Sequence, residues 1–187
     1  MQKCSFISLG GGKMKNFCKI FITTVLLSLL FVGTAWADEW DWNMVQGHHN
    51  ESILLNQGET SAEDSFYQYG RGEYLAEGSV QIVNQENGDI YIRADTYAYL
   101  QVDRILHTIF LDVWVESEND WDQVGYWDFE QTKEEADGDL TMLTTIFTLT
   151  GYETNRYYRV RGLHGVELND ELEACATETD GVLITDN

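Results

Sequence analysis

The sequence predicts an all-β fold: an antiparallel β-sandwich of about seven strands in one domain. From Arg71 onward, apolar and polar residues alternate with the period of two expected of half-buried strands. These segments are rich in Val, Ile, Thr, Tyr and Trp, and turn residues separate them at intervals of roughly 10–15 residues. No window has a convincing helical periodicity. A small barrel is the alternative arrangement of the same strands.

Residues 1–37 have the pattern of a secretory signal peptide. Lys13, Lys15 and Lys19 precede an apolar run over residues 20–34, and an Ala-x-Ala site follows at residues 35–37. The run is shorter than the roughly 20 residues that a membrane span needs. Residues 10–13, Gly-Gly-Gly-Lys, match a translated ribosome-binding site, so we expect translation to start at Met14. The sequence therefore predicts a bacterial protein that is cleaved after Ala37 and secreted.

The charge balance excludes two classes of partner. The chain has 11 Lys and Arg residues against 32 Asp and Glu residues, a net charge of −21. Cleavage would leave seven basic residues against the same 32 acidic ones, or −25. Nucleic acids and anionic membranes both need a basic surface, so we expect neither as a partner of this acidic protein.

The mature chain divides into an arm and a domain. Residues 38–70 are rich in acidic, amide and small residues without sustained periodicity, which predicts a mostly disordered acidic arm. Residues 71–187 form the predicted sandwich. Asn87-Gly88 predicts a hairpin turn between its first two strands. The strand segments are residues 80–83, 90–98, 105–116, 124–129, 140–149, 156–163, 172–177 and 182–184.

The segment from Leu149 to Arg161 resembles the E–F corner and F strand of immunoglobulin-like and fibronectin type III domains. In those folds an inward Tyr at the start of the strand caps the corner. Tyr158 matches this residue, with Tyr157 as the alternative if the register slips by one. We therefore expect an immunoglobulin-like sandwich.

Three motifs carry a family resemblance: Arg71-Gly72-Glu73-Tyr74-Leu75, residues 157–164 (Tyr-Tyr-Arg-Val-Arg-Gly-Leu-His) and residues 177–184 (Thr-Glu-Thr-Asp-Gly-Val-Leu-Ile). With the signal peptide, they resemble a family of small secreted Gram-positive proteins known as a domain of unknown function, over about residues 71–184. The resemblance implies secretion and a β-rich fold, and it supplies no catalytic or binding residues.

The sequence predicts no enzyme and no cofactor. His107 and His164 are the histidines of the predicted domain, and His107 falls on the apolar face of its strand. No Gly-x-Ser-x-Gly elbow, His-Glu-x-x-His motif or paired-Cys metal motif occurs.

An aromatic and charged platform is the candidate binding site. Strand 105–116 would present one set of outward side chains and strand 156–163 another, and the two strands pair in an immunoglobulin-like sandwich. Aromatic faces stack on sugars while Arg and Asp bind hydroxyls, so an extracellular glycan or protein is the expected ligand. The alternative is that these side chains form cross-strand pairs that cover the sheet. The platform residues are Phe110, Asp112, Trp114, Tyr157, Arg159 and Arg161.

Calcium binding is a second hypothesis, because acidic loops concentrate the oxygen ligands that calcium prefers. The candidate ligands are Glu118, Asp120, Asp122, Asp137 and Asp139. A third hypothesis is a structural or self-associating cell-envelope protein, linked through Cys175. This cysteine would be the one left after cleavage, so it has no partner for an intramolecular disulfide.

Overall fold

A computed structural model describes residues 46–47, 52–67 and 73–186. The predicted signal peptide and the proposed start at Met14 lie outside these residues, as do most of the residues from 38 to 51. Within the described ranges, no helix is long and apolar enough to cross a membrane. The described residues form strands, turns and loops, which confirms the all-β prediction.

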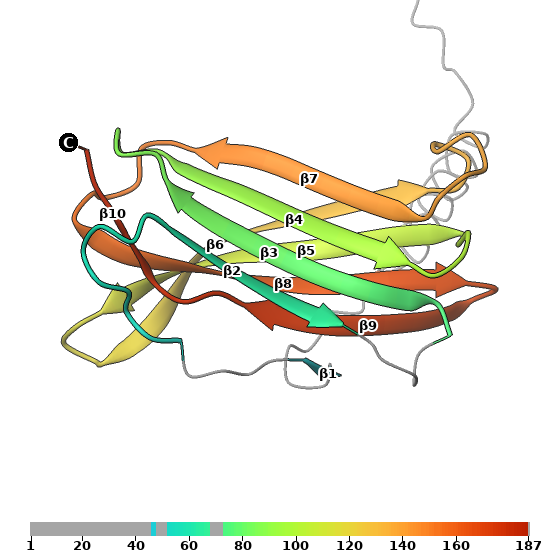
Figure 1. Ribbon diagram of the computed structural model, residues 1–187, viewed down its shortest axis with the longest axis horizontal. Coiled ribbons are helices and arrows are strands. Elements are labelled where there is room, and N and C mark those ends of the chain that lie inside the picture. The colour runs from blue at the N-terminus through green and yellow to red at the C-terminus, as the bar shows by residue number, and fades with distance from the viewer. Residues whose placement is uncertain (1–45, 48–51, 68–72, 187) are drawn as a thin grey trace, which may run out of the picture. The chain divides into compact units, whose positions relative to one another are not determined.

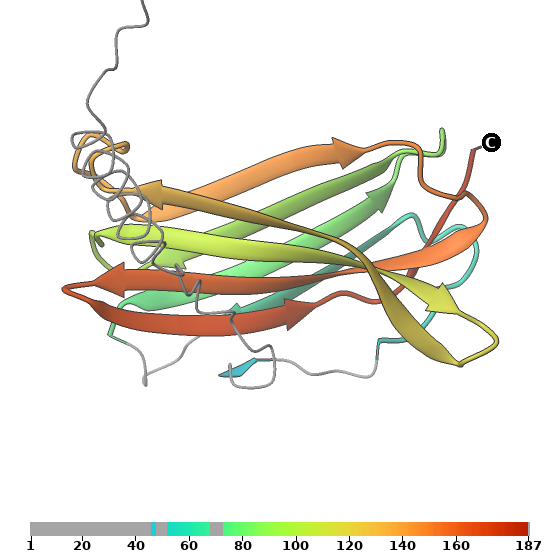
Figure 2. The same cartoon turned by 180° about the vertical axis from the view of Figure 1, so that it is seen from behind.

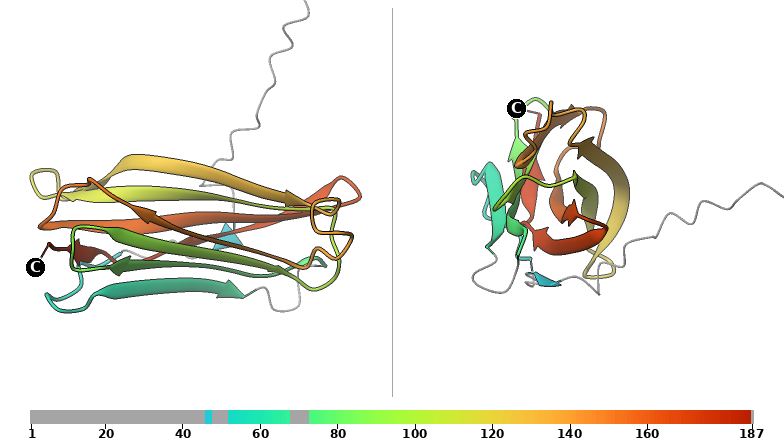
Figure 3. Two further views of the ribbon diagram at one scale, coloured as in Figure 1. Left: turned by 90° about the horizontal axis from the view of Figure 1, so that it is seen from above. Right: turned by 90° about the vertical axis from the view of Figure 1, so that its right-hand side faces the viewer.

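Two sheets face each other, as predicted for a sandwich, and their strand pairs are antiparallel except for the parallel pair of β1 with β9 (Figures 1, 2 and 3). We call the first one sheet I; its strand order is β2-β3-β4-β7. The second, sheet II, has the order β1-β9-β8-β5-β6, and β10 also pairs with β8. The strands are β1 (Gln46–Gly47), β2 (Ser61–Tyr67), β3 (Leu75–Asn84), β4 (Ile90–Ala98), β5 (Arg104–Val115), β6 (Asp120–Thr132), β7 (Met142–Leu149), β8 (Arg156–Leu168), β9 (Glu171–Glu178) and β10 (Val182–Ile184).

From β2 onward, the described chain changes sheet three times. β2, β3 and β4 follow one another in sheet I, and β5 and β6 then form a hairpin in sheet II. β7 returns to sheet I beside β4, and β8 lies beside β5 in sheet II. The neighbours β4 and β7, and likewise β5 and β8, are therefore not consecutive in sequence, a Greek-key type of connection.

The inward side chains form two apolar clusters between the sheets. The larger contains residues such as Ile82, Ile92, Ile109 and Val160, all buried. The smaller contains Leu75, Val102, Ile105, Leu140, Val166 and Cys175. The predicted alternation of β5 is confirmed, because Ile105, His107, Ile109, Leu111 and Val113 are all buried.

A hydrogen-bonded polar chain crosses the core. Thr96 Oγ1 lies 3.2 Å from His107 Nδ1 and 2.8 Å from His164 Nδ1. The other ring nitrogens, both Nε2, bond Thr145 Oγ1 at 2.7 Å and Thr177 Oγ1 at 2.9 Å. The Thr96 hydroxyl has one proton, so it donates to one imidazole and accepts from the other. Both ring nitrogens of each neutral histidine are therefore hydrogen-bonded to a threonine hydroxyl.

Gly78 on β3 makes room for this polar chain. A Cβ at this position would lie 2.5 Å from His164 Cγ and 2.7 Å from Cys175 Sγ, closer than packed atoms come. Glycine is therefore required where β3 passes over the His164 ring.

Tyr158 points into the core at the start of β8, and Tyr157 does not. The Tyr158 ring is buried and its hydroxyl donates to the backbone carbonyl of Glu153 at 3.0 Å. Tyr157 faces the other way, and its hydroxyl donates to the Leu55 carbonyl at 3.0 Å. The register is thus the one that the sequence favoured.

The prediction of a mostly disordered arm over residues 38–70 is wrong for residues 61–67, which form a strand. Residues 61–67 are β2, which pairs with β3 from Ser61↔Val83 to Tyr67↔Glu77. Ala62 and Leu55 pack against the larger cluster. The segment was missed because only alternate residues of this acidic strand face inward, and those include Asp64.

The β3–β4 hairpin is confirmed where Asn87-Gly88 predicted it, with a different turn. A two-residue Asn-Gly turn would need positive φ at both residues. The loop instead spans residues 85–89, with positive φ at Glu86 (60°) and Gly88 (85°). The Gln85 N–H closes it by donating to the Asp89 carbonyl at 3.2 Å.

Candidate functional site

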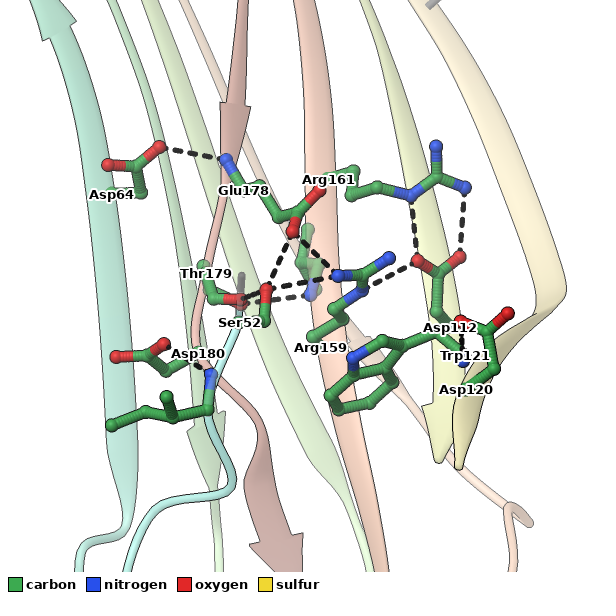
Figure 4. Close-up of polar contacts among 12 residues, drawn as sticks. Ser52, Asp64, Asp112, Asp120, Trp121, Arg159, Arg161, Glu178, Thr179 and Asp180 are labelled. Carbon is green, nitrogen blue, oxygen red and sulfur yellow. Dashed lines mark hydrogen bonds and ion pairs between the residues drawn. The ribbon is translucent and has the colours of Figure 1, made fainter. Parts of the chain in front are cut away.

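β5 and β8 pair in register, so four of the six platform residues lie together on the outer face of sheet II. Phe110 is opposite Arg161, and Asp112 is opposite Arg159. The three polar side chains form one ion cluster on this face (Figure 4).

Asp112 is the centre of the ion cluster. Its Oδ2 accepts from Arg159 Nε at 2.9 Å and from Arg161 Nε at 2.7 Å, and its Oδ1 accepts from Arg161 Nη2 at 2.9 Å. Arg159 Nη1 also donates to Glu178 Oε1 at 2.6 Å. Two carboxylates therefore balance two guanidinium groups. The Asp112 side chain is 2% exposed, and each Arg side chain 14%.

The segment 52–57, which we call the covering segment, crosses the ion cluster. Ser52 Oγ lies 2.7 Å from Glu178 Oε1 and 2.8 Å from the Thr179 carbonyl oxygen, which share its single proton, and it accepts from Arg159 Nη1 at 3.0 Å. Leu55 N–H donates to the Gly181 carbonyl at 2.9 Å. This part of the outer face is therefore closed by the chain's own N-terminal side.

Two aromatic rings complete the cover. The Arg159 guanidinium carbon lies 4.7 Å from the centroid of the Trp121 ring, and that of Arg161 lies 4.8 Å from the Phe110 ring. A cation over an aromatic face is a stabilising arrangement. The four residues Phe110, Asp112, Arg159 and Arg161 thus pair with one another and with the covering segment, as the cross-strand alternative expected.

Sequence reasoning missed Ser52, Trp121 and Glu178 as members of this cluster. Ser52 and Glu178 are separated by 126 residues, and no local pattern links them. Glu178 belongs to the Thr177–Ile184 motif, which was the available signal. Trp121 follows the β5–β6 turn, where a register shift at Leu111/Asp112 marks a β-bulge that re-aims the start of β6.

The remaining platform residues, Trp114 and Tyr157, line a different feature, a cleft of about 630 Å³ that we call the end cleft. Trp114 also packs edge-on against Trp121, with ring centroids 5.3 Å apart. Arg156 Nη2 donates to the Trp114 carbonyl at 3.0 Å and fixes the strand end. The lining residues are Gln57, Trp114, Val115, Glu116, Ser117, Asn155, Arg156, Tyr157 and Leu183.

The chemistry of the end cleft is mixed. Its lining offers two aromatic side chains, two side-chain amides and a hydroxyl. The lining also includes one guanidinium, on Arg156, and one carboxylate, on Glu116, so its formal charges sum to zero. The Arg156 guanidinium is already engaged by Glu153 Oε2 at 2.8 Å. Aromatic faces beside neutral hydrogen-bonding groups suit an uncharged polar ligand.

The residues with the most perturbed pKa values lie in the core, away from the cleft. Burial lowers the pKa of His107 to about 4, against a small opposing effect of Asp95. Burial, and then the neighbouring His107, lowers the pKa of His164 to about 3. Burial raises the pKa of the Cys175 thiol to about 12. All three groups are enclosed between the sheets.

The calcium candidates are not brought together. Glu118, Asp120 and Asp122 lie where β5 turns into β6, whereas Asp137 and Asp139 lie beyond the other end of β6. Asp120 Oδ1 accepts from the Trp121 N–H at 2.7 Å, and Asp139 Oδ1 accepts from Gln101 at 3.1 Å. Among the residues that the structure describes, no three His, Cys, Asp or Glu side chains gather where they could hold a metal ion.

Most of the fold and most of the site residues lie within a stretch that matches a known family. Residues 45–182 match DUF6147, described as a family of unknown function. The chain belongs to this family. The match begins before Arg71, where the resemblance was expected to start, and so takes in β2 and the covering segment of the DUF6147 domain. No curated protein matches the chain.

Proposed function

We propose that this DUF6147 protein is a secreted bacterial binding module without catalytic activity, and that it binds an extracellular glycan in the end cleft. Secretion is supported by residues 1–37, whose basic, apolar and Ala-x-Ala segments are those of a cleaved signal peptide. We propose a Gram-positive origin as well, and its support is the resemblance of residues 71–75, 157–164 and 177–184 to a family of small secreted Gram-positive proteins.

The positions of His107, His164 and Cys175 support a non-enzymatic role. A general base or nucleophile must reach its substrate, within hydrogen-bond distance or through one water. These three side chains are enclosed in the core, and each imidazole nitrogen already bonds a threonine hydroxyl. A disulfide through Cys175 between folded copies would require the sandwich to open, which weighs against the self-associating alternative.

The observation that carries the proposal is the pairing of Trp114 and Tyr157 with neutral polar groups in one cleft. A sugar ring offers an apolar face for stacking and hydroxyls at its rim. Gln57, Ser117 and Asn155 supply donors and acceptors of the matching kind. Because the lining is electrically neutral, we expect an uncharged glycan.

We also propose that the sandwich is of the immunoglobulin or fibronectin type III kind. Support comes from β7 lying beside β4, from β8 lying beside β5, and from the Tyr158 corner. β2 is an additional strand on the outside of β3.

The experiment is a binding screen of residues 38–187 against neutral hexasaccharides of glucose and of mannose. Titration calorimetry measures the binding, because Trp114→Ala removes the fluorophore that lines the cleft. Trp114→Ala and Gln57→Ala are expected to weaken binding about tenfold each, the effect of losing a stacking face or an amide contact. Tyr126→Ala is the matched control, because Tyr126 is an exposed aromatic on β6 that does not line the cleft.

Three results would overturn the proposal. One is the absence of binding by any neutral glycan. Another is equal loss of binding in Tyr126→Ala and Trp114→Ala, with thermal melts confirming that both variants fold. The third is hydrolysis of a bound hexasaccharide, which would make the protein an enzyme.

A further inference from the structure

The outer face of sheet I carries a second, unassigned feature. The pairing of β2, β3, β4 and β7 places outward side chains in rows that run across the four strands. Ala62, Val80, Ala94 and Phe147 pack against the core, which fixes the outward direction of their neighbours. Three consecutive rows are Glu63-Gln81-Arg93-Ile146, Ser65-Ser79-Asp95-Thr144 and Tyr67-Glu77-Tyr97-Met142.

The middle row is made of short side chains, so the face is hollow there. Long side chains in the two flanking rows, roughly 14 Å apart from the strand rise, form the walls. The result is a groove of about 330 Å³ between them. We call it the sheet I groove, and its lining residues are Glu63, Glu77, Ser79, Val80, Gln81, Arg93, Asp95 and Tyr97.

Ser79 on the groove floor is the observation that points to a ligand. Its side chain faces outward into the groove, yet the residue is only 8% exposed. The polar side chains around Ser79 bond other partners. The Asp95 carboxylate accepts from Arg93 and Thr144, and the Gln81 amide donates to Glu63. Among the described residues, the Ser79 hydroxyl has no hydrogen-bond partner. A hydroxyl on the groove floor that no protein group engages can bond a ligand group without breaking a hydrogen bond within the protein.

The charge of the groove selects the ligand. Its lining has three carboxylates, on Glu63, Glu77 and Asp95, and one guanidinium, on Arg93. Arg93 is held by Asp95 through Nε at 2.6 Å and Nη2 at 3.1 Å. Glu63 and Glu77 are therefore left to attract a cation.

A saccharide fits this face better than a peptide does. Peptides that bind sheets add a strand at an edge, where backbone groups are unpaired. The backbone of β3 and β4 is paired on both sides along the groove floor. Recognition here must come from side chains, and the groove supplies a hydroxyl floor, carboxylates and the Tyr97 ring.

From the partnerless Ser79 hydroxyl, the short middle row and the excess of carboxylates, we infer that the sheet I groove binds a cationic amino-sugar chain, such as a glucosamine oligomer. The Ser79 hydroxyl bonds a sugar hydroxyl, Glu63 and Glu77 pair with protonated amines, and Tyr97 lies against a ring face. This site is separate from the end cleft, so either can fail without the other.

The experiment measures calorimetric binding of a glucosamine hexamer to residues 38–187 at about pH 6, where its amines are protonated. Glu77→Gln is expected to weaken binding about fivefold and Tyr97→Ala about tenfold. Ser79→Ala is expected to weaken binding while leaving the melting temperature unchanged or raised, because the lost hydroxyl had no partner. Tyr91→Ala is the matched control, since Tyr91 is the next outward residue of β4 and does not line the groove.

Binding that falls in the three groove variants, persists in Tyr91→Ala and persists in Trp114→Ala supports the inference. Equal binding of hexalysine, or of the fully N-acetylated hexamer, overturns it, because the attraction would then be general or independent of the amines. No measurable binding of the glucosamine hexamer also overturns it. A drop in the melting temperature of Ser79→Ala would show that the hydroxyl has a structural partner, against the premise.

Discussion

The outer faces of both sheets carry an ion pair between Arg and Asp, enclosed on sheet II and open to solvent on sheet I. On sheet II, Arg159 and Arg161 meet Asp112 under the covering segment, and these Arg side chains are 14% exposed. On sheet I, Arg93 meets Asp95 beside an open groove, and the Arg93 side chain is 43% exposed. An ion pair enclosed by its own chain serves the fold, because breaking it leaves a buried charge. An open pair costs little to disturb and stays available to a ligand.

The largest expected effect comes from opening the enclosed pair. Arg159→Met would leave Glu178 and Asp112 each without one charged partner, while preserving the length of the side chain. We expect unfolding free energy to fall by about 3–5 kcal/mol, the usual cost of removing one partner of a buried ion pair. Urea unfolding monitored by Trp fluorescence measures this. A loss below about 1 kcal/mol would mean that the ion cluster behaves as a surface pair.

A second test concerns the polar chain of the core, which is enclosed like the ion cluster but uncharged. The lowered pKa values of His107 and His164 mean that the folded state binds protons less readily than the unfolded chain. Their stabilising effect is therefore complete above about pH 6.5 and is lost as pH falls toward about 4 for His107 and about 3 for His164. We expect unfolding free energy to fall by about 3 kcal/mol between pH 7 and pH 5.

The matched variant for this pH effect is His107→Gln. An amide keeps hydrogen-bonding groups near Thr96 and Thr145 and does not titrate, so its pH dependence should be shallower than that of the native protein. Identical pH profiles for the native protein and the variant would contradict the assignment of the effect to His107. Circular dichroism melts across this pH range provide the comparison.

Sequence patterns predicted the features that depend on local spacing. The alternation of β5, the core position of His107, the β3–β4 hairpin and the inward position of Tyr158 all follow from periods or turns within a few residues. The features that patterns missed depend on register between distant strands. Ser52 meets Glu178 across 126 residues. The sheet I groove depends on the pairing of β2 with β3, and β2 lies in the segment where the sequence predicts the arm.

The covering segment gives a third, smaller test. Ser52→Ala removes a hydroxyl whose single proton is shared by Glu178 and the Thr179 carbonyl and which accepts from Arg159. We expect a loss of about 1–2 kcal/mol, because partly buried groups lose a partner without losing their charge balance. Ser65→Ala on the outer face of sheet I is the control, and its effect should be within about 0.5 kcal/mol. An equal effect of the two substitutions would mean that the segment does not close the ion cluster.

The smallest effect is expected at the open pair, and it bears directly on function. Arg93→Met removes the partner of Asp95, but Thr144 still donates to that carboxylate and solvent reaches the site through the groove. Discounted for screening, the loss of stability should be below about 1 kcal/mol, and it should shrink further in high salt. The same substitution leaves the groove with three carboxylates and no cation, so glucosamine-hexamer binding should strengthen about threefold. A variant that loses little stability yet binds more tightly would separate the ligand-facing pair from the structural one. Weaker binding in Arg93→Met would instead place the guanidinium itself in contact with the sugar.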